Sequence, residues 1–351
     1  MPPIVASPDR IALAPGLEIS RVVTGLWQVA DMERGGRTLD PDVSARELAA
    51  YATAGFDTFD MADHYGSAEI ITGRYLAGAR SGALARGPAG APRAFTKWCP
   101  PPGPMTRDVV REGIGRSLDR MALDRVDLMQ FHWWIFQHPA YLDALEQMAR
   151  LRDEGRIGQI GLTNFDTDHL SLVVRHGLPI VSNQVSFSLL DRRAAGAMTA
   201  FCLQSGVRLL AYGTLGGGFL SDRWVGKPEP TDIPDWSKSK YKRFIDVIGG
   251  WQPLQALLAT LSTIARRHGV SVSNVATRWV LQQPAVAAVI IGARLGESEH
   301  RADNLKLFSF ALDADDLAAI ESATAQLQPL PGDCGDEYRK PPFLTASGDL
   351  S

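Results

Sequence analysis

The chain has 351 residues, of which 36 are Lys or Arg and 39 are Asp or Glu, so its formal net charge is -3 at pH 7. This balance provides no basic footprint for nucleic acid or an anionic membrane, and we expect small-molecule partners. The three cysteines are too few and too scattered for a disulfide framework or a thiolate metal site, which predicts a reducing compartment. The N-terminus lacks a signal-peptide pattern and no apolar window has membrane-spanning length, so we expect a soluble cytoplasmic protein.

Short apolar runs recur along the chain, and most are followed by a segment of helical periodicity. The predicted strands cover residues 22–27, 56–61, 93–98, 126–132, 157–163, 180–186, 208–213 and 287–293. The clearest predicted helices cover residues 40–55, 106–123, 139–155 and 251–269. Asp40 and Thr106 can cap the first two of these helices, and the last two end at glycines that suit a left-handed cap.

Nearly continuous apolar strands joined by helices are typical of a parallel sheet covered by helices. Eight strands in a chain of this length favour an α/β fold of the closed (β/α)₈ TIM barrel type over an open doubly wound sheet. A doubly wound dinucleotide-binding domain would also carry G-x-G-x-x-G after its first strand, and that motif is absent. We predict one barrel domain over residues 1–351, with its core at about 8–325 and a C-terminal tail at 326–351.

Three segments depart from the alternating pattern. Residues 8–20, with a Pro15-Gly16 turn between short apolar stretches, predict a β-hairpin ahead of the barrel. Residues 221–250 form a long loop after the seventh strand, and a loop of this length in a compact domain favours a functional role. The tail from about residue 328 has too many prolines and glycines for a helix.

Polar side chains stand at or just after the ends of the predicted strands. They are Asp60, Tyr65, Lys97, His132, Thr163, Asn164, Gln184 and Tyr212. Because the carboxyl ends of the strands build the active face of a barrel, we expect these side chains at one rim. Each residue alone is more often a solvated or structural one, but their joint occurrence favours a catalytic site.

Three of these residues predict a proton donor. An isolated phenol has a pKa of about 10, too high for ready proton donation at neutral pH. A nearby ammonium favours the phenolate and lowers that pKa, and a carboxylate keeps the ammonium charged and in place. We therefore predict that Asp60, Lys97 and Tyr65 form a tuned general acid, and that His132 orients a carbonyl oxygen toward Tyr65.

The proton donor needs a partner that attacks the carbonyl carbon. The set of strand-end residues holds no serine or cysteine with a paired base, so hydride from a nicotinamide cofactor is the expected partner. Asn164 and Gln184 would bind the carboxamide of the nicotinamide, and Tyr212 would provide a platform for its ring.

Seven segments, in the same order along the chain, resemble the aldo-keto reductase superfamily of NAD(P)H-dependent (β/α)₈ barrels. They are GFDTFDMADHYGSAEIITGRYL, TKW, LMQFHWW, IGLTNF, SNQVSFSLL, LLAYGTLGGGFL and IIGARLGESEHRADNL. The resemblance spans about residues 8–325 and implies a catalytic tetrad of Asp60, Tyr65, Lys97 and His132. The segments SDRWVG and IPDWSKSKYK are closer to the branch of the potassium-channel β subunits and their bacterial relatives than to the aldose reductase branch.

The same resemblance implies the residues of a cofactor site. They are Trp27, Asp60, Thr163, Asn164, Gln184, Tyr212, Gly213, Leu215, Gly216, Arg223, Lys238, Gly292, Arg294, Asp303 and Asn304. Arg223 and Lys238 would clamp the phosphates, with Lys240 and Lys242 as further candidates. Arg294 would pair with a 2'-phosphate, which favours NADP(H) over the alternative, NAD(H).

A substrate pocket follows from the resemblance as well. Trp27, His64, Trp98, Trp133 and Trp134 are implied to line it, and the loop at 221–250 and the tail near 335–345 would close over it. Several tryptophans favour an apolar or ring-bearing aldehyde or ketone, and sugars also stack on such rings. The physiological substrate, the reaction direction and the oligomeric state stay open.

Two other readings compete with a reductase. A regulatory protein could keep the barrel and the cofactor but turn over little, as the channel β subunits illustrate. A metal-dependent barrel is disfavoured because the histidines lack ligand spacing, with no H-x-H after the first strand and no H-E-x-x-H. We therefore predict no metal site.

Overall fold

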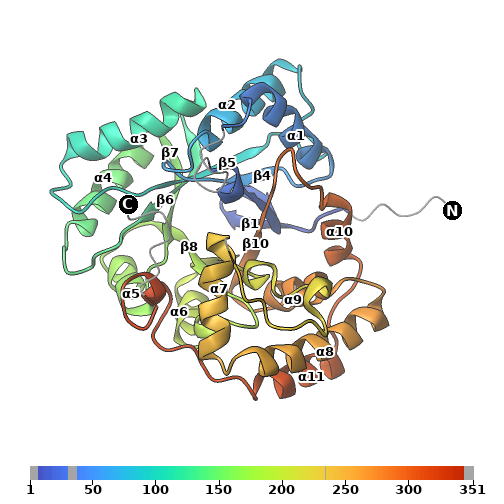
Figure 1. Ribbon diagram of the computed structural model, residues 1–351. Coiled ribbons are helices and arrows are strands. Elements are labelled where there is room, and N and C mark those ends of the chain that lie inside the picture. Colours follow the sequence, from blue (N-terminus) through green and yellow to red (C-terminus); the bar gives the residue numbers. More distant parts are fainter. Residues whose placement is uncertain (1–6, 31–37, 234, 344–351) are drawn as a thin grey trace.

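Parallel strands close into a barrel in the computed structural model, which describes residues 7–30, 38–233 and 235–343 (Figure 1). Around the barrel the order is β10-β3-β4-β5-β6-β7-β8-β9. β10 pairs with both β3 and β9, and this closes the barrel. The strands are β3 (Val22–Gly25), β4 (Thr58–Asp60), β5 (Arg93–Trp98), β6 (Val126–His132), β7 (Ile157–Thr163), β8 (Ile180–Ser186), β9 (Arg208–Tyr212) and β10 (Val286–Gly292). The predicted TIM barrel is confirmed, and every predicted strand end lies within two residues of the observed one.

Helices surround the barrel (Figure 1). They are α1 (Pro41–Thr53), α2 (Ala68–Ser81), α3 (Arg107–Met121), α4 (Tyr141–Asp153), α5 (Thr167–Arg175), α6 (Ala197–Ser205), α8 (Trp251–His268), α9 (Val272–Leu281), α10 (Arg301–Leu305) and α11 (Ala314–Thr324). Asp40 accepts hydrogen bonds from two backbone N–H groups at the start of α1, and Thr106 accepts one at the start of α3. Gly155 and Gly269 adopt left-handed φ angles of 80° and 67° after α4 and α8. The capping signals in the sequence therefore set these helix ends.

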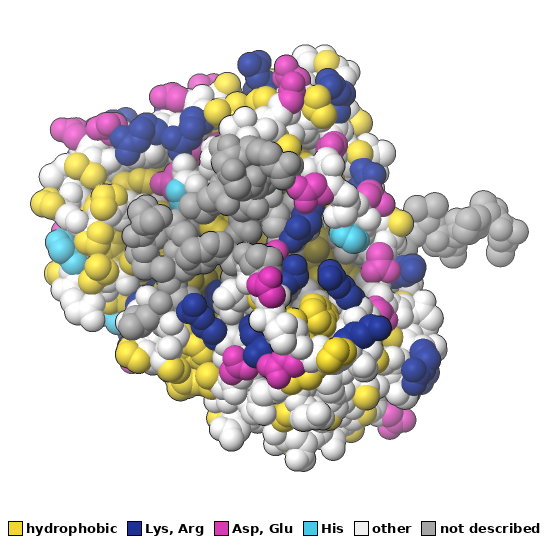
Figure 2. Space-filling model, viewed as in Figure 1, with side chains coloured by type: hydrophobic (Ala, Val, Ile, Leu, Met, Phe, Trp, Pro, Cys, Tyr) yellow, Lys and Arg dark blue, Asp and Glu magenta, His cyan; other side chains and the backbone are white. Residues whose placement is uncertain are grey.

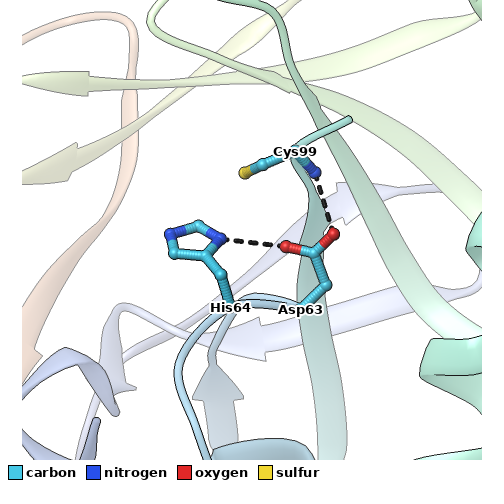
Figure 3. A group of neighbouring side chains, drawn as sticks. All are labelled: Asp63, His64 and Cys99. Atoms are coloured by element: carbon cyan, nitrogen blue, oxygen red, sulfur yellow. Dashed lines mark hydrogen bonds and ion pairs between the residues drawn. The ribbon is translucent and has the colours of Figure 1, made fainter. Parts of the chain in front are cut away.

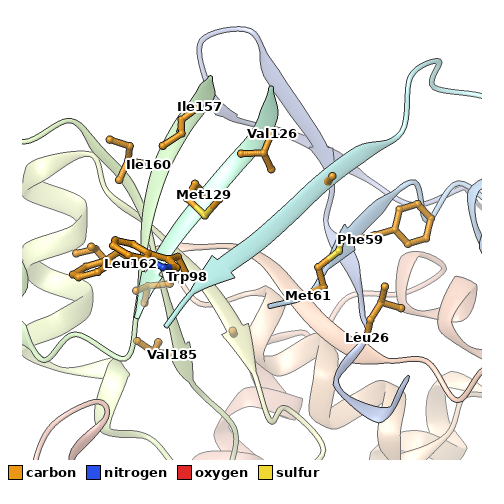
Figure 4. Close-up of a cluster of buried hydrophobic side chains, with 14 of the residues drawn as sticks. Leu26, Phe59, Met61, Trp98, Val126, Met129, Ile157, Ile160, Leu162 and Val185 are labelled. Carbon is orange, nitrogen blue, oxygen red and sulfur yellow. The ribbon is translucent and has the colours of Figure 1, made fainter. Parts of the chain in front are cut away.

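The main hydrophobic layer lies between the outer face of the strands and the helices (Figure 4). Met129, Ile160 and Leu162 are fully buried in it. Because successive side chains of a strand point to opposite faces, the residues between them point into the barrel. This alternation leaves the barrel interior for polar groups at the carboxyl ends of the strands.

The predicted N-terminal hairpin forms from β1 (Arg10–Ala14) and β2 (Leu17–Ser20), with Gly16 at a φ of 76° in the turn. Its buried side chains Leu13 and Ile19 pack in one cluster with residues of the barrel interior. Arg10 forms an ion pair of 3.0 Å with Asp57, which is buried just ahead of β4. The hairpin therefore covers the amino-terminal end of the barrel and leaves the opposite end open.

The long connection after β9 is not irregular throughout, because it carries the helix α7 (Trp236–Val247). The Asp235 side chain caps α7 by accepting a hydrogen bond of 2.9 Å from the Lys238 backbone N–H. Phe244 and Ile245 are fully buried in a cluster with residues of α8. Their helical spacing after Tyr241 is the signal that the sequence offered for this helix.

The C-terminal tail follows α11. Between residues 328 and 343 it forms the short 3₁₀ helix η7 (Asp336–Tyr338) and no α-helix, as its prolines and glycines predict. No helix within the described ranges is long and apolar enough to cross a membrane.

Candidate active site

A buried ion pair joins the carboxyl ends of two adjacent strands. Lys97 on β5 donates from Nζ to Asp60 Oδ2 on β4 at 2.6 Å, and the two side chains are 3% and 4% exposed. The ammonium also donates to the Met61 carbonyl oxygen at 2.9 Å. Since breaking a buried pair leaves an uncompensated charge, the two residues hold each other in place.

The second oxygen of the Asp60 carboxylate is also occupied. Gln130 and Gln184 each donate from Nε2 to Asp60 Oδ1 at 2.8 Å. Gln184 also donates to Gln130 Oε1 at 2.7 Å. Sequence reasoning missed Gln130, although its position two residues before His132 on β6 places both side chains on the same face of that strand.

Tyr65 follows β4 on the loop that leads to α2. The Lys97 Nζ lies 4.9 Å from the centroid of its ring. Trp27 and His64 pack edge-on against the same ring, at centroid distances of 4.9 and 4.8 Å. The structure therefore brings together Asp60, Lys97 and Tyr65.

His132 lies at the end of β6, the strand next to β5, which carries Lys97. Its Nε2 is 3.3 Å from Asn164 Nδ2, and its Nδ1 is 3.5 Å from Cys99 Sγ. Asn164 adopts a left-handed φ of 57°, a conformation that asparagine tolerates better than most residues. This turn at the end of β7 directs the Asn164 side chain toward His132 and Tyr212, whose hydroxyl donates to Asn164 Oδ1 at 2.8 Å.

One cavity of about 650 Å³ collects these groups at the carboxyl ends of the strands. The predicted residues that line it are Trp27, Asp60, Tyr65, Lys97, His132, Thr163, Asn164, Gln184, Tyr212, Gly213, Leu215, Arg223, Lys238, Gly292, Arg294, Asp303 and Asn304. Gly216 is the exception among the predicted cofactor residues. It is buried away from the cavity, and a Cβ there would lie 2.6 Å from the Leu190 side chain, so its role is in packing.

Cationic side chains gather on the cavity wall beside α7 (Figure 2). Lys238 and Arg294 each form an ion pair of 3.3 Å with Asp235, and Arg294 also lies 3.8 Å from Glu297. Burial raises the pKa of Asp235, but the Lys238 backbone N–H and the charges of Lys238 and Arg294 outweigh it and hold that pKa below its ordinary value. Arg223 completes this part of the wall.

The two further phosphate candidates separate in the structure. Lys240 lines the cavity. Lys242 does not, and it forms ion pairs with Glu229 and Asp246 at 2.6 and 2.5 Å. The structure therefore keeps Lys240 as a candidate and removes Lys242.

The C-terminal tail contributes residues that the sequence did not reveal. Tyr338 lines the cavity, and its hydroxyl accepts a hydrogen bond of 2.5 Å from Lys240 Nζ. Glu337 is fully buried, pairs with Arg193 at 2.8 Å and accepts from the Tyr212 hydroxyl at 3.3 Å. Of the predicted closing segment at 335–345, residues 344 and 345 lie outside the described residues.

Two titrating groups at this contact are shifted in opposite directions. Burial, with Tyr338 and Glu337 nearby, raises the pKa of Tyr212 well above its ordinary value. Burial also raises the pKa of Glu337, but the charges of Arg193 and Lys240 outweigh it and hold that pKa below its ordinary value. Glu337 is therefore a buried carboxylate, and Tyr212 beside it is a neutral phenol.

The structure corrects part of the predicted substrate pocket. Trp98 directly follows Lys97 on β5, so it points to the outer face and packs in the hydrophobic core (Figure 4). Trp133 follows His132 in the same way, is fully buried and donates from Nε1 to the Ile135 carbonyl oxygen at 2.8 Å. Neither residue lines the cavity: Trp98 faces away from it by strand alternation, and Trp133, directly after β6, is held in the core by its hydrogen bond.

The remaining predicted pocket residues lie at the active face. Trp27 lines the cavity directly. Trp134 is 7% exposed and packs against the rings of His132 and Tyr338, and His64 packs against Tyr65. Trp134 and His64 therefore do not line the cavity as predicted, but pack against residues that do.

The cavity offers groups that fit a nicotinamide cofactor. Among the described residues, Thr163 Oγ1 is a buried atom on this wall without a hydrogen-bond partner, next to the amide of Asn164. A buried hydroxyl without a partner is costly, and the carboxamide of a nicotinamide would satisfy it. Gly213 lines the cavity after β9 with a φ of 70°. A Cβ there would clash with the Tyr241 hydroxyl, so only glycine fits this position.

Comparisons with known proteins agree with this geometry. A family model described as "Aldo/keto reductase family" matches residues 21–325. The chain is 30% identical over 343 residues to "Protein tas" of Escherichia coli. The aligned region covers 87% of this chain and 97% of that protein. It is 24% identical over 338 residues to the NADH-specific methylglyoxal reductase of the same organism, covering 88% of this chain and 96% of that protein.

The fold comparison gives the same architecture. A solved glycerol dehydrogenase from Gluconobacter oxydans superposes with a TM-score of 0.72 at 22% identity, over 94% of this chain and 98% of that one. The resemblance inferred from the sequence, including its placement among bacterial reductases, is confirmed.

Proposed function

Because this chain belongs to the aldo/keto reductase family, we propose that it reduces an aldehyde or ketone to the alcohol with a nicotinamide cofactor and Tyr65 as proton donor. The observation that carries the proposal is the buried Lys97–Asp60 pair of 2.6 Å beside the Tyr65 ring. A buried ion pair is costly to desolvate and contributes little to stability compared with apolar packing, which favours a functional role for this one.

The chain's own residues account for the proton. Tyr65 gives the proton of its hydroxyl to the carbonyl oxygen of the substrate, which leaves negative charge on the phenolate. The Lys97 ammonium stabilises that charge because it lies 4.9 Å from the centre of the Tyr65 ring, and Asp60 keeps the ammonium in position. His132, on the neighbouring strand β6, orients the carbonyl oxygen. The bound cofactor supplies the hydride that reduces the carbonyl carbon.

Other residues of the wall would hold the cofactor. Thr163, Asn164 and Gln184 offer the hydroxyl and amide groups that a carboxamide needs, and Tyr212 offers a ring at the same level. Gly213, Leu215, Gly217 and Gly218 line the same cavity and would offer backbone groups to the phosphates, and Arg223 would add a positive charge. Asp303 and Asn304 would contact the adenine.

We favour NADPH over NADH as the cofactor. Arg294 and Lys238 lie on the cavity wall at the end away from Tyr65, where a 2'-phosphate could replace Asp235 as their partner. The relative named as NADH-specific shows that the preferred cofactor varies among the similar proteins.

The test is a panel of aldehydes and ketones, including apolar, ring-bearing and sugar substrates, mixed with the purified protein and NADPH. We expect NADPH absorbance to fall with at least one carbonyl compound and the matching alcohol to appear in equal amount. A reaction without carbonyl compound corrects for background oxidation. Tight NADPH binding without alcohol formation across the panel would contradict the reductase and favour a cofactor-binding regulatory protein.

A further inference from the structure

Beside the active site lies a group of side chains that carbonyl reduction does not use. Asp63, His64 and Cys99 come from the loops after the adjacent strands β4 and β5, and each is half-buried. One possible ligand atom from each residue lies within 4.8 Å of the other two. Figure 3 shows the Cys99 sulfur and the His64 ring on one side of the Asp63 carboxylate.

The two loops hold this group in place through bonds of their own. The Asp63 backbone N–H donates to the Lys97 carbonyl oxygen at 2.9 Å, and the Cys99 backbone N–H donates to Asp63 Oδ2 at 3.1 Å. His64 Nδ1 lies 2.9 Å from the other carboxylate oxygen (Figure 3). The backbone of both loops is therefore held by neighbouring strands of the barrel, so the three side chains start from positions close together.

The geometry points to a zinc site, and we propose that Asp63, His64 and Cys99 bind one Zn²⁺ next to the active site. A thiolate, an imidazole and a carboxylate are the ligand types that zinc takes, whereas magnesium and calcium take oxygen ligands. Zinc sites with three protein ligands keep a fourth position for water. Bond lengths of about 2.0–2.3 Å require the ligand atoms to close in modestly from their present separations, which side-chain rotation at half-exposed positions allows.

The three cysteines of the chain differ in their burial, and this difference favours Cys99 as the zinc ligand. Burial raises the pKa of Cys202 to about 12 and raises the pKa of Cys334 well above its ordinary value. Both residues are almost fully buried, whereas Cys99 is half-exposed. Cys99 is thus the cysteine that an ion from solvent can reach, and it would coordinate as a thiolate and release its proton to solvent.

The position of the group links it to His132. Cys99 Sγ lies 3.5 Å from His132 Nδ1, the nitrogen on the opposite side of the ring from Asn164. A bound zinc ion would take the sulfur away from this contact and place positive charge beside the imidazole. Zinc occupancy should therefore slow a reaction in which His132 orients the substrate.

The binding test uses the full chain and Co²⁺, which replaces zinc and gives a visible and near-ultraviolet spectrum when a thiolate binds it. We expect one cobalt ion per chain, with a thiolate charge-transfer band that added Zn²⁺ removes. Cys99→Ser should abolish the band, and His64→Gln should weaken binding at least tenfold in calorimetric titrations. His176→Gln, which changes an exposed histidine paired with Glu146, serves as the matched control and should bind like the unmodified protein. The absence of a cobalt band, or its persistence in Cys99→Ser, would overturn the proposal.

A second arm measures the link to His132. With a carbonyl substrate identified, Zn²⁺ at a concentration that saturates the site should lower the turnover of the unmodified protein severalfold. The turnover of Cys99→Ser should be the same with and without Zn²⁺. Zinc that binds without changing turnover would overturn the link. A protein that shows the cobalt band but reduces no carbonyl compound would refute the proposed function and leave the zinc site standing.

Discussion

The two ends of the cavity are built on different physical principles. At the end near Tyr65, Asp60 and Lys97 are 4% and 3% exposed, and both carboxylate oxygens of Asp60 accept hydrogen bonds of 2.6–2.8 Å. At the other end, the charged groups are half-exposed, Arg294 is 42% exposed, and the ion pairs through Asp235 are longer, at 3.3 Å. One end is a buried, fully hydrogen-bonded network, and the other is a set of partly exposed ion pairs.

This difference fits the two tasks proposed for the cavity, catalysis and cofactor binding. A group that takes part in chemistry must hold its geometry before the substrate arrives, and burial with full hydrogen bonding provides that rigidity. A group that binds a phosphate must give up its present partner, and exposed pairs cost about 1 kcal/mol or less to separate. Changes at the Tyr65 end should therefore have much larger effects than changes at the phosphate end.

The largest effect is expected from Tyr65→Phe, which removes only the proton donor. Turnover with the best carbonyl substrate should fall about 10²- to 10⁴-fold, the usual contribution of general acid catalysis, while the NADPH dissociation constant stays unchanged. Steady-state rates and fluorescence titration with NADPH measure the two quantities. Tyr75→Phe removes a buried hydroxyl that donates to the Ala85 carbonyl oxygen, outside the cavity, and should keep its turnover. If Tyr65→Phe retains most of its turnover, the general-acid assignment is wrong.

A large loss of stability is expected from Glu337→Gln, which leaves the buried Arg193 with one carboxylate partner fewer. The free energy of unfolding at neutral pH should fall by about 3 kcal/mol, as for other broken buried pairs. Because the folded-state pKa of Glu337 is lowered, its charge stabilises the protein above the ordinary pKa of a glutamate. This contribution is lost as the pH falls through the folded-state value.

Urea unfolding at neutral pH and at several acidic values tests this dependence. The difference between the unmodified protein and Glu337→Gln should shrink with acidification. Glu321→Gln, at an exposed position on α11, is the control and should differ little at any pH. An equal loss of stability at every pH would show that the Glu337 charge is not responsible.

At the phosphate end, Arg294→Ala should weaken NADPH binding about tenfold, the effect of one lost hydrogen bond to a charged group, and leave NADH binding unchanged. Parallel titrations of both cofactors measure the ratio. Arg116→Ala removes an exposed arginine on α3 and should leave both affinities unchanged. Tighter binding of NADH than of NADPH by the unmodified protein would overturn the proposed preference.

The smallest effect is expected from Asp235→Asn, which keeps a good cap for α7 but removes the charge shared by Lys238 and Arg294. Freed from this competitor, the two cations should bind NADPH about twofold to fivefold more tightly, in line with the strength of exposed ion pairs. Asp313→Asn makes the same change at the cap of α11, where the partner is Arg267, and should have no effect on cofactor binding. Weaker NADPH binding in Asp235→Asn would mean that Asp235 supports the phosphate site rather than competes with it.

Part of the site could be predicted because its residues follow the strand pattern. Asp60, Lys97 and His132 end predicted strands, so the barrel brings them to one rim whatever the details of packing. The same alternation would have identified Gln130 and excluded Trp98, had it been applied residue by residue. The helix α7 was also readable, from the spacing of Tyr241 and Phe244.

Other parts had no signal in the local sequence. Glu337 and Tyr338 stand in a tail rich in prolines and glycines, far along the chain from Arg193, Tyr212 and Lys240, which they contact. The grouping of Cys99 with Asp63 and His64 depends on the pairing of β4 with β5.

The sequence by itself predicted the order of strands and helices and the polar residues expected at the carboxyl ends of the strands, because periodicity and capping are local properties. Only the tertiary structure decided which cations meet Asp235, where the tail crosses the cavity and which tryptophans face it. Those outcomes depend on side chains that are distant in sequence and compete for the same space and the same charges. Buried and exposed pairs of charges look alike in a sequence, and their burial separates the Asp60–Lys97 pair from the pairs around Asp235.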